Sequence, residues 1–108
     1  MARRILFLCS QNKLRSPTAE AIYAERAGIE VDSAGLNHDA EVPISPEQLA
    51  WADLIVVMEK EHRSRLTRRF SKHLAGKRIA VLNIPDDYDF MDPVLIGLLE
   101  KRCQPYLP

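Results

Sequence analysis

Residues 5–17 read ILFLCSQNKLRSP, and this stretch indicates both the fold and the site. The apolar run ends at Cys9, which places the thiol at the carboxyl end of a predicted strand, where open α/β sheets bind their ligands. Ser16 is a favoured N-cap residue, and Pro17 suits the first position of a helix. We therefore expect the N–H groups of the loop to converge beside a helix N-terminus, which attracts anions and acidifies thiols.

Length and charge narrow the classes of protein. The chain has 108 residues, with 15 Lys and Arg residues against 15 Asp and Glu residues. This length fits one domain, so we expect residues 1–108 to form a single domain. The balanced charge gives no reason to expect nucleic acid or a membrane as the main partner. The apolar stretch within Met1–Leu8 is too short for a signal peptide, and we expect a cytoplasmic protein without transmembrane segments.

The two cysteines lie at opposite ends of the chain. Cys9 and Cys103 match neither a disulfide scaffold nor a zinc pattern, so we expect reduced thiols. The three histidines, His38, His62 and His73, show no metal-binding spacing, and we expect neither a metal nor a cofactor. Cys103 lies on an apolar helix face, where packing explains it.

Strand and helix patterns alternate along the chain. Predicted strands cover residues 5–8, 29–31, 54–57 and 78–82. Predicted helices cover residues 17–27, 46–51 behind a Ser-Pro-Glu-Gln capping box, 61–74, and 93–103 behind Asp92. The first, third and fourth strands are nearly continuous apolar runs, as in parallel strands covered on both faces. We expect an α/β fold, a small doubly wound sandwich with a four-stranded parallel sheet flanked by helices. Leu36–Pro43 lacks periodicity and reads as an ordinary surface loop.

These blocks together resemble the low-molecular-weight protein tyrosine phosphatase family. The signature of that family is a cysteine, five intervening residues, an arginine and then Ser-Pro, with an asparagine three residues after the cysteine. Cys9, Asn12, Arg15 and Ser16-Pro17 match it. Later blocks resembling the family are VDSAG at residues 31–35, ADLIVVM at 52–58 and IPD at 84–86. The resemblance spans most of the chain in four ordered blocks.

The chain departs from the family pattern in three places. The stretch Leu36–Ala52 is shorter than usual, so a segment beside the substrate is trimmed. Gln11 stands where glycine is common, and Leu14 stands where a second cysteine is common, which removes a vicinal disulfide. The acid loop usually reads Asp-Pro, whereas here Asp86 is followed by Asp87.

The resemblance implies a phosphatase that hydrolyses phosphotyrosine or small aryl phosphate monoesters through a phosphocysteine intermediate. Cys9 is then the nucleophile, and Arg15 can bind two phosphoryl oxygens at once. The partner is a phosphotyrosine protein or a small phosphate monoester, and inorganic phosphate or another oxyanion is a ligand. The expected substrate-binding residues are Ser10, Gln11, Asn12, Lys13, Leu14 and Ser16. The simpler alternative is that Cys9 is a buried strand-end cysteine and Arg15 a surface arginine.

The general acid has more than one candidate. Asp86 follows the fourth strand directly, so it emerges at the same sheet edge as Cys9 and is the first choice. Asp92 is fully explained as an N-cap before Pro93. Asp87 can substitute if the loop is rotated. The simpler alternative for all the aspartates from Asp86 to Asp92 is a purely solvated turn.

Three other functions compete with phosphatase activity. A phosphate- or phosphoprotein-binding module with weak or no turnover is the main alternative, since the acid is uncertain and the flanking segment is short. Arsenate reductases share the loop but need further cysteines. A nucleic-acid adaptor would use the basic stretch of residues 62–73, although a solvated helix face explains that stretch better.

Overall fold

The sheet follows the topology that the sequence predicts. The computed structural model describes residues 2–108. Its four strands are β1 (Arg3–Cys9), β2 (Ile29–Gly35), β3 (Leu54–Val57) and β4 (Arg78–Val81). They form one sheet in the order β2-β1-β3-β4, and every neighbouring pair is parallel. The predicted four-stranded parallel sheet is confirmed.

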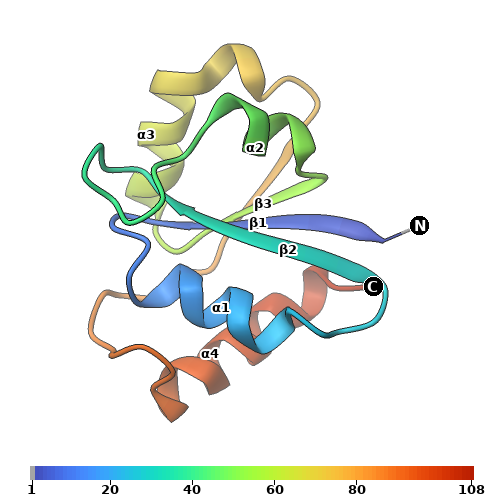
Figure 1. The fold of residues 1–108 in the computed structure, drawn as a ribbon, viewed down its shortest axis with the longest axis vertical. Coiled ribbons are helices and arrows are strands. Elements are labelled where there is room, and N and C mark those ends of the chain that lie inside the picture. The colour runs from blue at the N-terminus through green and yellow to red at the C-terminus, as the bar shows by residue number, and fades with distance from the viewer. Residues whose placement is uncertain (1) are drawn as a thin grey trace.

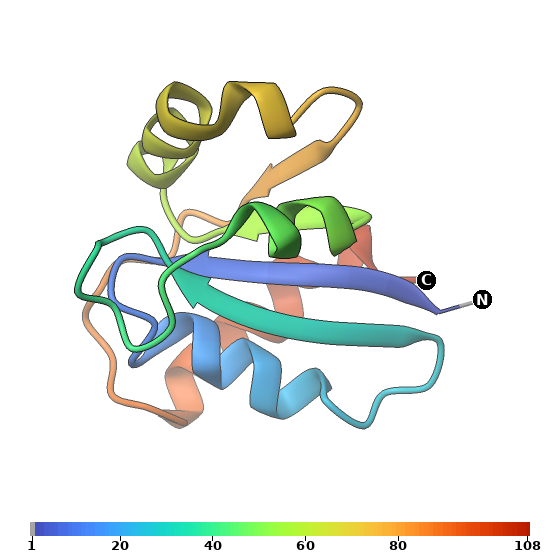
Figure 2. The same ribbon diagram turned by 45° about the horizontal axis from the view of Figure 1, so that its top comes forward.

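Helices cover both faces of this sheet. They are α1 (Arg15–Tyr23), α2 (Pro46–Trp51), α3 (Lys60–Phe70), which continues into a 3₁₀ turn (Ser71–His73), and α4 (Pro93–Cys103). In Figures 1 and 2, α1 and α4 lie on one face and α2 and α3 on the other. This is the doubly wound α/β arrangement expected from the sequence. Within residues 2–108, no helix is both long and apolar enough to cross a membrane.

Two apolar layers hold the helices against the sheet. Successive side chains of β1 point to opposite faces, because a strand has a two-residue period. Ile5 and Phe7 pack in the layer that contains Leu95 of α4, whereas Leu6 packs in the layer that contains Leu66 of α3. Since β1 is buried on both faces, it needs the unbroken apolar run seen in the sequence.

The start of α1 differs from the prediction. The Thr18 N–H donates to the Leu14 carbonyl at 3.1 Å, so the helix begins at Arg15 and Leu14 is its N-cap. Ser16 is therefore not the N-cap but lies in the first turn. Pro17 does not prevent this earlier start, because the first-turn N–H groups of a helix have no partner within it.

The other two predicted helix starts are confirmed. Ser45 and Gln48 form the capping box of α2, and Pro46 is its first residue. Asp92 accepts from the Val94 N–H at 2.8 Å at the start of α4.

The strand order places one special position at the carboxyl end of β1. The chain runs from β1 outward to β2 and then crosses back to β3 on the other side of β1. Ligands of open α/β sheets bind at such a switch point. The carboxyl ends of β1, β3 and β4 meet at this edge. Cys9 is the last residue of β1, and Glu59 and Asp86 lie in the segments that follow β3 and β4.

Candidate active site

The catalytic residues predicted from the sequence line one small cavity at this edge. It has a volume of about 90 Å³. Its lining residues are Cys9, Gln11, Lys13, Leu14, Arg15 and Asp86. The fold thus brings Cys9, at the end of β1, beside the start of α1 and the segment after β4. The side chains of Ser10, Asn12 and Ser16 do not line the cavity and make contacts within the protein instead.

Asn12 and Ser16 form a buried network beside the nucleophile. Asn12 has a φ of 57°, a left-handed conformation that asparagine tolerates. Its side-chain amide donates to Ser16 Oγ at 3.0 Å and to Ser33 Oγ at 2.9 Å. Ser16 Oγ lies 2.9 Å from Cys9 Sγ. Ser16 Oγ also lies 3.5 Å from the Ala34 carbonyl oxygen, so its single hydroxyl hydrogen has two acceptors, of which the Cys9 sulfur is the nearer.

The segment Leu36–Pro43 is more than the ordinary surface loop expected from the sequence. Its N–H groups donate to the first three carbonyls of the cysteine loop: Leu36 to Cys9 at 2.9 Å, Asn37 to Ser10 at 3.0 Å and Glu41 to Gln11 at 2.9 Å. Within a peptide plane the N–H points opposite to the C=O. The N–H groups of Ser10 and Gln11 therefore point away from this segment. The segment Leu36–Pro43 therefore supports the cysteine loop through these hydrogen bonds.

Gly35 allows this close packing. A Cβ atom there would lie 2.7 Å from the Ser10 carbonyl oxygen and 2.5 Å from Ala40 Cβ. Any larger residue at this position would displace either the cysteine loop or the supporting segment.

The guanidinium of Arg15 is held in one orientation. The side chain is only 2% exposed. Its Nη1 donates to Glu59 Oε2 at 2.6 Å and to the Ile84 carbonyl at 2.8 Å, which uses both hydrogens of that nitrogen. Within residues 2–108, Nε and Nη2 make no hydrogen bond, although Asp86 Oδ1 lies 3.7 Å from Nε. The edge formed by these two nitrogens has the geometry that binds two phosphoryl oxygens at once.

Two residues of this site, Glu59 and His62, were not predicted. His62 is 2% exposed, and its Nε2 lies 2.9 Å from Ser10 Oγ. From the sequence, His62 falls in the basic stretch of residues 62–73 that is explained by a solvated helix face, and no role is predicted for Glu59. A usable signal was present, because a Glu-x-x-His pair directly after a buried strand ends at the same sheet edge as Cys9.

His62 makes stability depend on pH. The pKa of His62 is lowered from 6.5 to about 4, mainly by burial and also by the positive charge of Arg15, while Glu59 opposes the shift. Between pH 6.5 and about 4 the unfolded state therefore binds more protons than the folded state, so stability falls as the pH falls through this range. We expect this histidine to contribute a loss of up to about 3 kcal/mol at pH 4. Urea unfolding of the native chain and of His62→Gln at several pH values measures this loss. If the free energy of unfolding changed with pH equally in both proteins, His62 would not be its source.

Of the three candidate aspartates for the general acid, only Asp86 lines the cavity. Asp86 lines the cavity, and its Oδ1 lies 3.7 Å from Arg15 Nε. The Asp86 side chain is 60% exposed, so solvent reaches it. Asp92 caps α4 and Asp87 is exposed, and neither lines the cavity.

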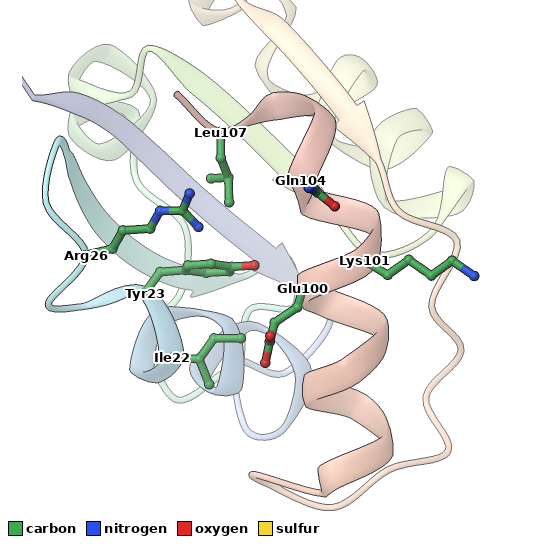
Figure 3. A pocket seen from close by; sticks show the side chains of 7 residues that line it. All are labelled: Ile22, Tyr23, Arg26, Glu100, Lys101, Gln104 and Leu107. Carbon is green, nitrogen blue, oxygen red and sulfur yellow. The ribbon is translucent and has the colours of Figure 1, made fainter.

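A larger cavity lies at the opposite ends of α1 and α4. It has a volume of about 600 Å³, and neither cysteine lines it. Figure 3 shows the ring of Tyr23 between the two helices with Arg26 and Glu100 beside it, whereas the Lys101 side chain extends away from the ring. Cys103 is buried in the adjacent core, and burial raises its pKa to about 11. The Cys103 thiol packs in the core, as expected, and it does not line this cavity.

The fold and the site define a class: doubly wound α/β proteins with a cysteine and an arginine on the loop between the first strand and the first helix. The model of the low molecular weight phosphotyrosine protein phosphatase family matches residues 4–44. The resemblance to this family is thus confirmed: the chain has the family's fold and carries its signature segment.

One relative and two solved structures illustrate this similarity. The chain is 30% identical to a protein-arginine-phosphatase of Bacillus subtilis (strain 168), in a match that covers 64% of this chain and 64% of that protein. The match therefore spans less than two thirds of the length of that relative. The tyrosine phosphatase Wzb from Escherichia coli K30, solved with phosphate, superposes with a TM-score of 0.77 at 21% identity, covering 98% of this chain and 96% of that one. Vibrio vulnificus Wzb, solved with benzylphosphonate, gives a TM-score of 0.78 at 21% identity, covering 98% and 97%.

Proposed function

We propose that this chain is a cysteine-dependent phosphatase for phosphotyrosine or small aryl phosphate monoesters, and that residues 1–108 act as one phosphatase-like domain. The observation that carries the proposal is the cavity that joins Cys9, the held guanidinium of Arg15 and Asp86. These three groups supply a nucleophile, charge stabilisation and a proton, which are what phosphate monoester hydrolysis requires. A cytoplasmic location stays a prediction.

In the first step, the Cys9 thiolate attacks phosphorus. An S–P bond forms and the bond from phosphorus to the leaving oxygen breaks. Asp86, in its protonated form, gives its proton to that oxygen. The Nε and Nη2 groups of Arg15 bind two equatorial oxygens as charge spreads over them, and Ser16 donates to the sulfur.

In the second step, water hydrolyses the phosphocysteine. The Asp86 carboxylate takes a proton from the water while the water oxygen attacks phosphorus. The S–P bond then breaks, which releases inorganic phosphate and restores the Cys9 thiolate, again stabilised by Ser16.

Phosphoarginine is a second candidate substrate. The name of the Bacillus subtilis relative, a protein-arginine-phosphatase, favours it. The same cavity chemistry serves a P–N bond, since the leaving nitrogen also needs a proton. Turnover of free phosphoarginine, phosphotyrosine and para-nitrophenyl phosphate by one preparation ranks the two substrate classes. Binding of phosphate or vanadate without turnover of any of them would instead support the phosphate-binding module.

Replacing Asp86 tests the assignment of the acid. We expect Asp86→Asn to lower kcat for phosphotyrosine by about 10²–10⁴-fold, the usual contribution of a general acid. Phosphate affinity should be retained, because the cysteine loop is untouched. The matched control is Asp92→Asn, since asparagine caps helices as well as aspartate does. If Asp92→Asn lost activity and Asp86→Asn kept it, the acid would be assigned to the wrong residue.

A further inference from the structure

Glu59 and His62 connect α3 to two parts of the cysteine loop. Neither residue takes part in the two catalytic steps proposed above. Glu59 precedes the first turn of α3, and His62 lies within that turn. Glu59 contacts Arg15 at the far end of the loop, and His62 contacts Ser10 at its near end. The two side chains also lie together, with His62 Nε2 3.8 Å from Glu59 Oε2.

The hydrogen bonds of His62 fix which nitrogen carries the hydrogen. The backbone N–H of Glu59 donates to His62 Nδ1 at 3.2 Å, so Nδ1 is an acceptor. In a neutral imidazole the hydrogen is then on Nε2, which donates to Ser10 Oγ at 2.9 Å. The helix start thus orients the ring, and the ring holds the first residue after the nucleophile.

Glu59 acts on Arg15 in a comparable way. Its carboxylate and the Ile84 carbonyl take the two hydrogens of Nη1. This leaves Nε and Nη2 as the edge that faces an anion. Without Glu59, the Ile84 carbonyl alone would hold Nη1, and the guanidinium would lose its charge-assisted restraint.

We propose that Glu59 and His62 are a positioning pair for oxyanion binding, in which Glu59 sets the orientation of the Arg15 guanidinium and His62 sets the Ser10 end of the cysteine loop. This inference rests on the proposed function. It makes α3 a support of the site rather than only a charged outer helix.

The direction in which phosphate affinity changes when Glu59 is removed distinguishes two roles for this residue. If Glu59 only partly neutralised Arg15, its removal would strengthen phosphate binding, because a negative charge would leave the neighbourhood of an anion. If it positions Arg15, its removal weakens binding. The Glu59 side chain is 40% exposed, so its replacement should leave the protein folded.

The test measures inorganic phosphate binding by calorimetry alongside turnover of para-nitrophenyl phosphate. We expect Glu59→Ala to weaken phosphate binding about tenfold, with partial recovery in Glu59→Gln, which keeps an acceptor oxygen. The matched control Glu61→Gln removes a neighbouring exposed carboxylate and should change neither quantity.

The histidine is tested with two amides that each mimic one ring nitrogen. His62→Gln keeps a donor at the position of Nε2, whereas His62→Asn keeps only an acceptor at the position of Nδ1. We expect the asparagine variant to lose several-fold in phosphate affinity and the glutamine variant to stay close to native, with the exposed His73→Gln as control.

The outcomes are separable. Unchanged or tighter phosphate binding in Glu59→Ala would overturn the inference even if every other variant behaved as expected. Equal behaviour of His62→Asn and His62→Gln would overturn its His62 half. A native protein that binds phosphate but shows no turnover would refute the phosphatase, while the binding measurements would still decide the positioning pair. A native protein that neither binds phosphate nor hydrolyses the ester would overturn both.

Discussion

Cys9→Ser is expected to lower turnover of para-nitrophenyl phosphate by at least about 10⁴-fold, a scale typical for loss of a catalytic nucleophile. A serine hydroxyl is not ionised at neutral pH, and no base among the residues lining the cavity is placed to activate it except the partly exposed Asp86. Initial rates measured across about pH 5 to 8 quantify the effect. Phosphate binding should largely survive, because Arg15 and the loop remain.

The second cysteine is the matched control for this experiment. Cys103→Ala should keep native turnover, since the thiol is 1% exposed in the α4 core and away from the cavity. It should lose some stability through the cavity it leaves. If Cys103→Ala abolished turnover in a folded protein and Cys9→Ser did not, the site would be misplaced.

Arg15→Lys is expected to lower kcat/KM by about 10²–10³-fold although it keeps the positive charge. A lysine ammonium cannot bind two oxygens with the geometry of a guanidinium edge. It also cannot satisfy Glu59, the Ile84 carbonyl and a phosphoryl group together. The unsatisfied partners should cost a further ~1–3 kcal/mol of stability, which urea unfolding measures.

An exposed arginine provides the comparison. Arg63→Lys changes the same chemical group on the outer face of α3 and should leave rate and stability within error. A rate for Arg15→Lys within about threefold of native would show that charge alone suffices, and the bidentate role would then be wrong.

Most of the fold could be predicted from the sequence, because strands and helix starts are marked by residues that are close together in the sequence. Apolar runs at residues 5–8 and 54–57 lie within β1 and β3, and the capping residues Ser45 and Asp92 begin α2 and α4 as predicted. The prediction of Ser16 as the N-cap of α1 was wrong, because a Ser-Pro pair fits both the N-cap position and the first turn of a helix. The hydrogen bond that decides between these positions, from Thr18 to Leu14, has no sequence signature.

The site was predictable only where the loop itself defined it. Cys9, Arg15 and Asp86 follow from strand ends and motif, and the cavity joins them. The contributions of Glu59 and His62 depend on β3 lying beside β1, and that of the Leu36–Pro43 segment depends on β2 lying on the other side of β1. These neighbours are distant in the sequence, and the sheet order brings them together. Ser10 shows the limit of motif reasoning, because its side chain turns to His62 rather than into the cavity.

The most direct test of the account is to trap the covalent intermediate. The native protein is mixed with para-nitrophenyl phosphate, quenched within milliseconds and digested, and the peptide that contains Cys9 is examined by mass spectrometry, with Cys9→Ala as the blank. The account predicts one phosphoryl group on Cys9 at early times in the native protein and none on that peptide in the variant. Steady hydrolysis by the native protein with no phosphoryl group on Cys9 at any quench time would contradict it.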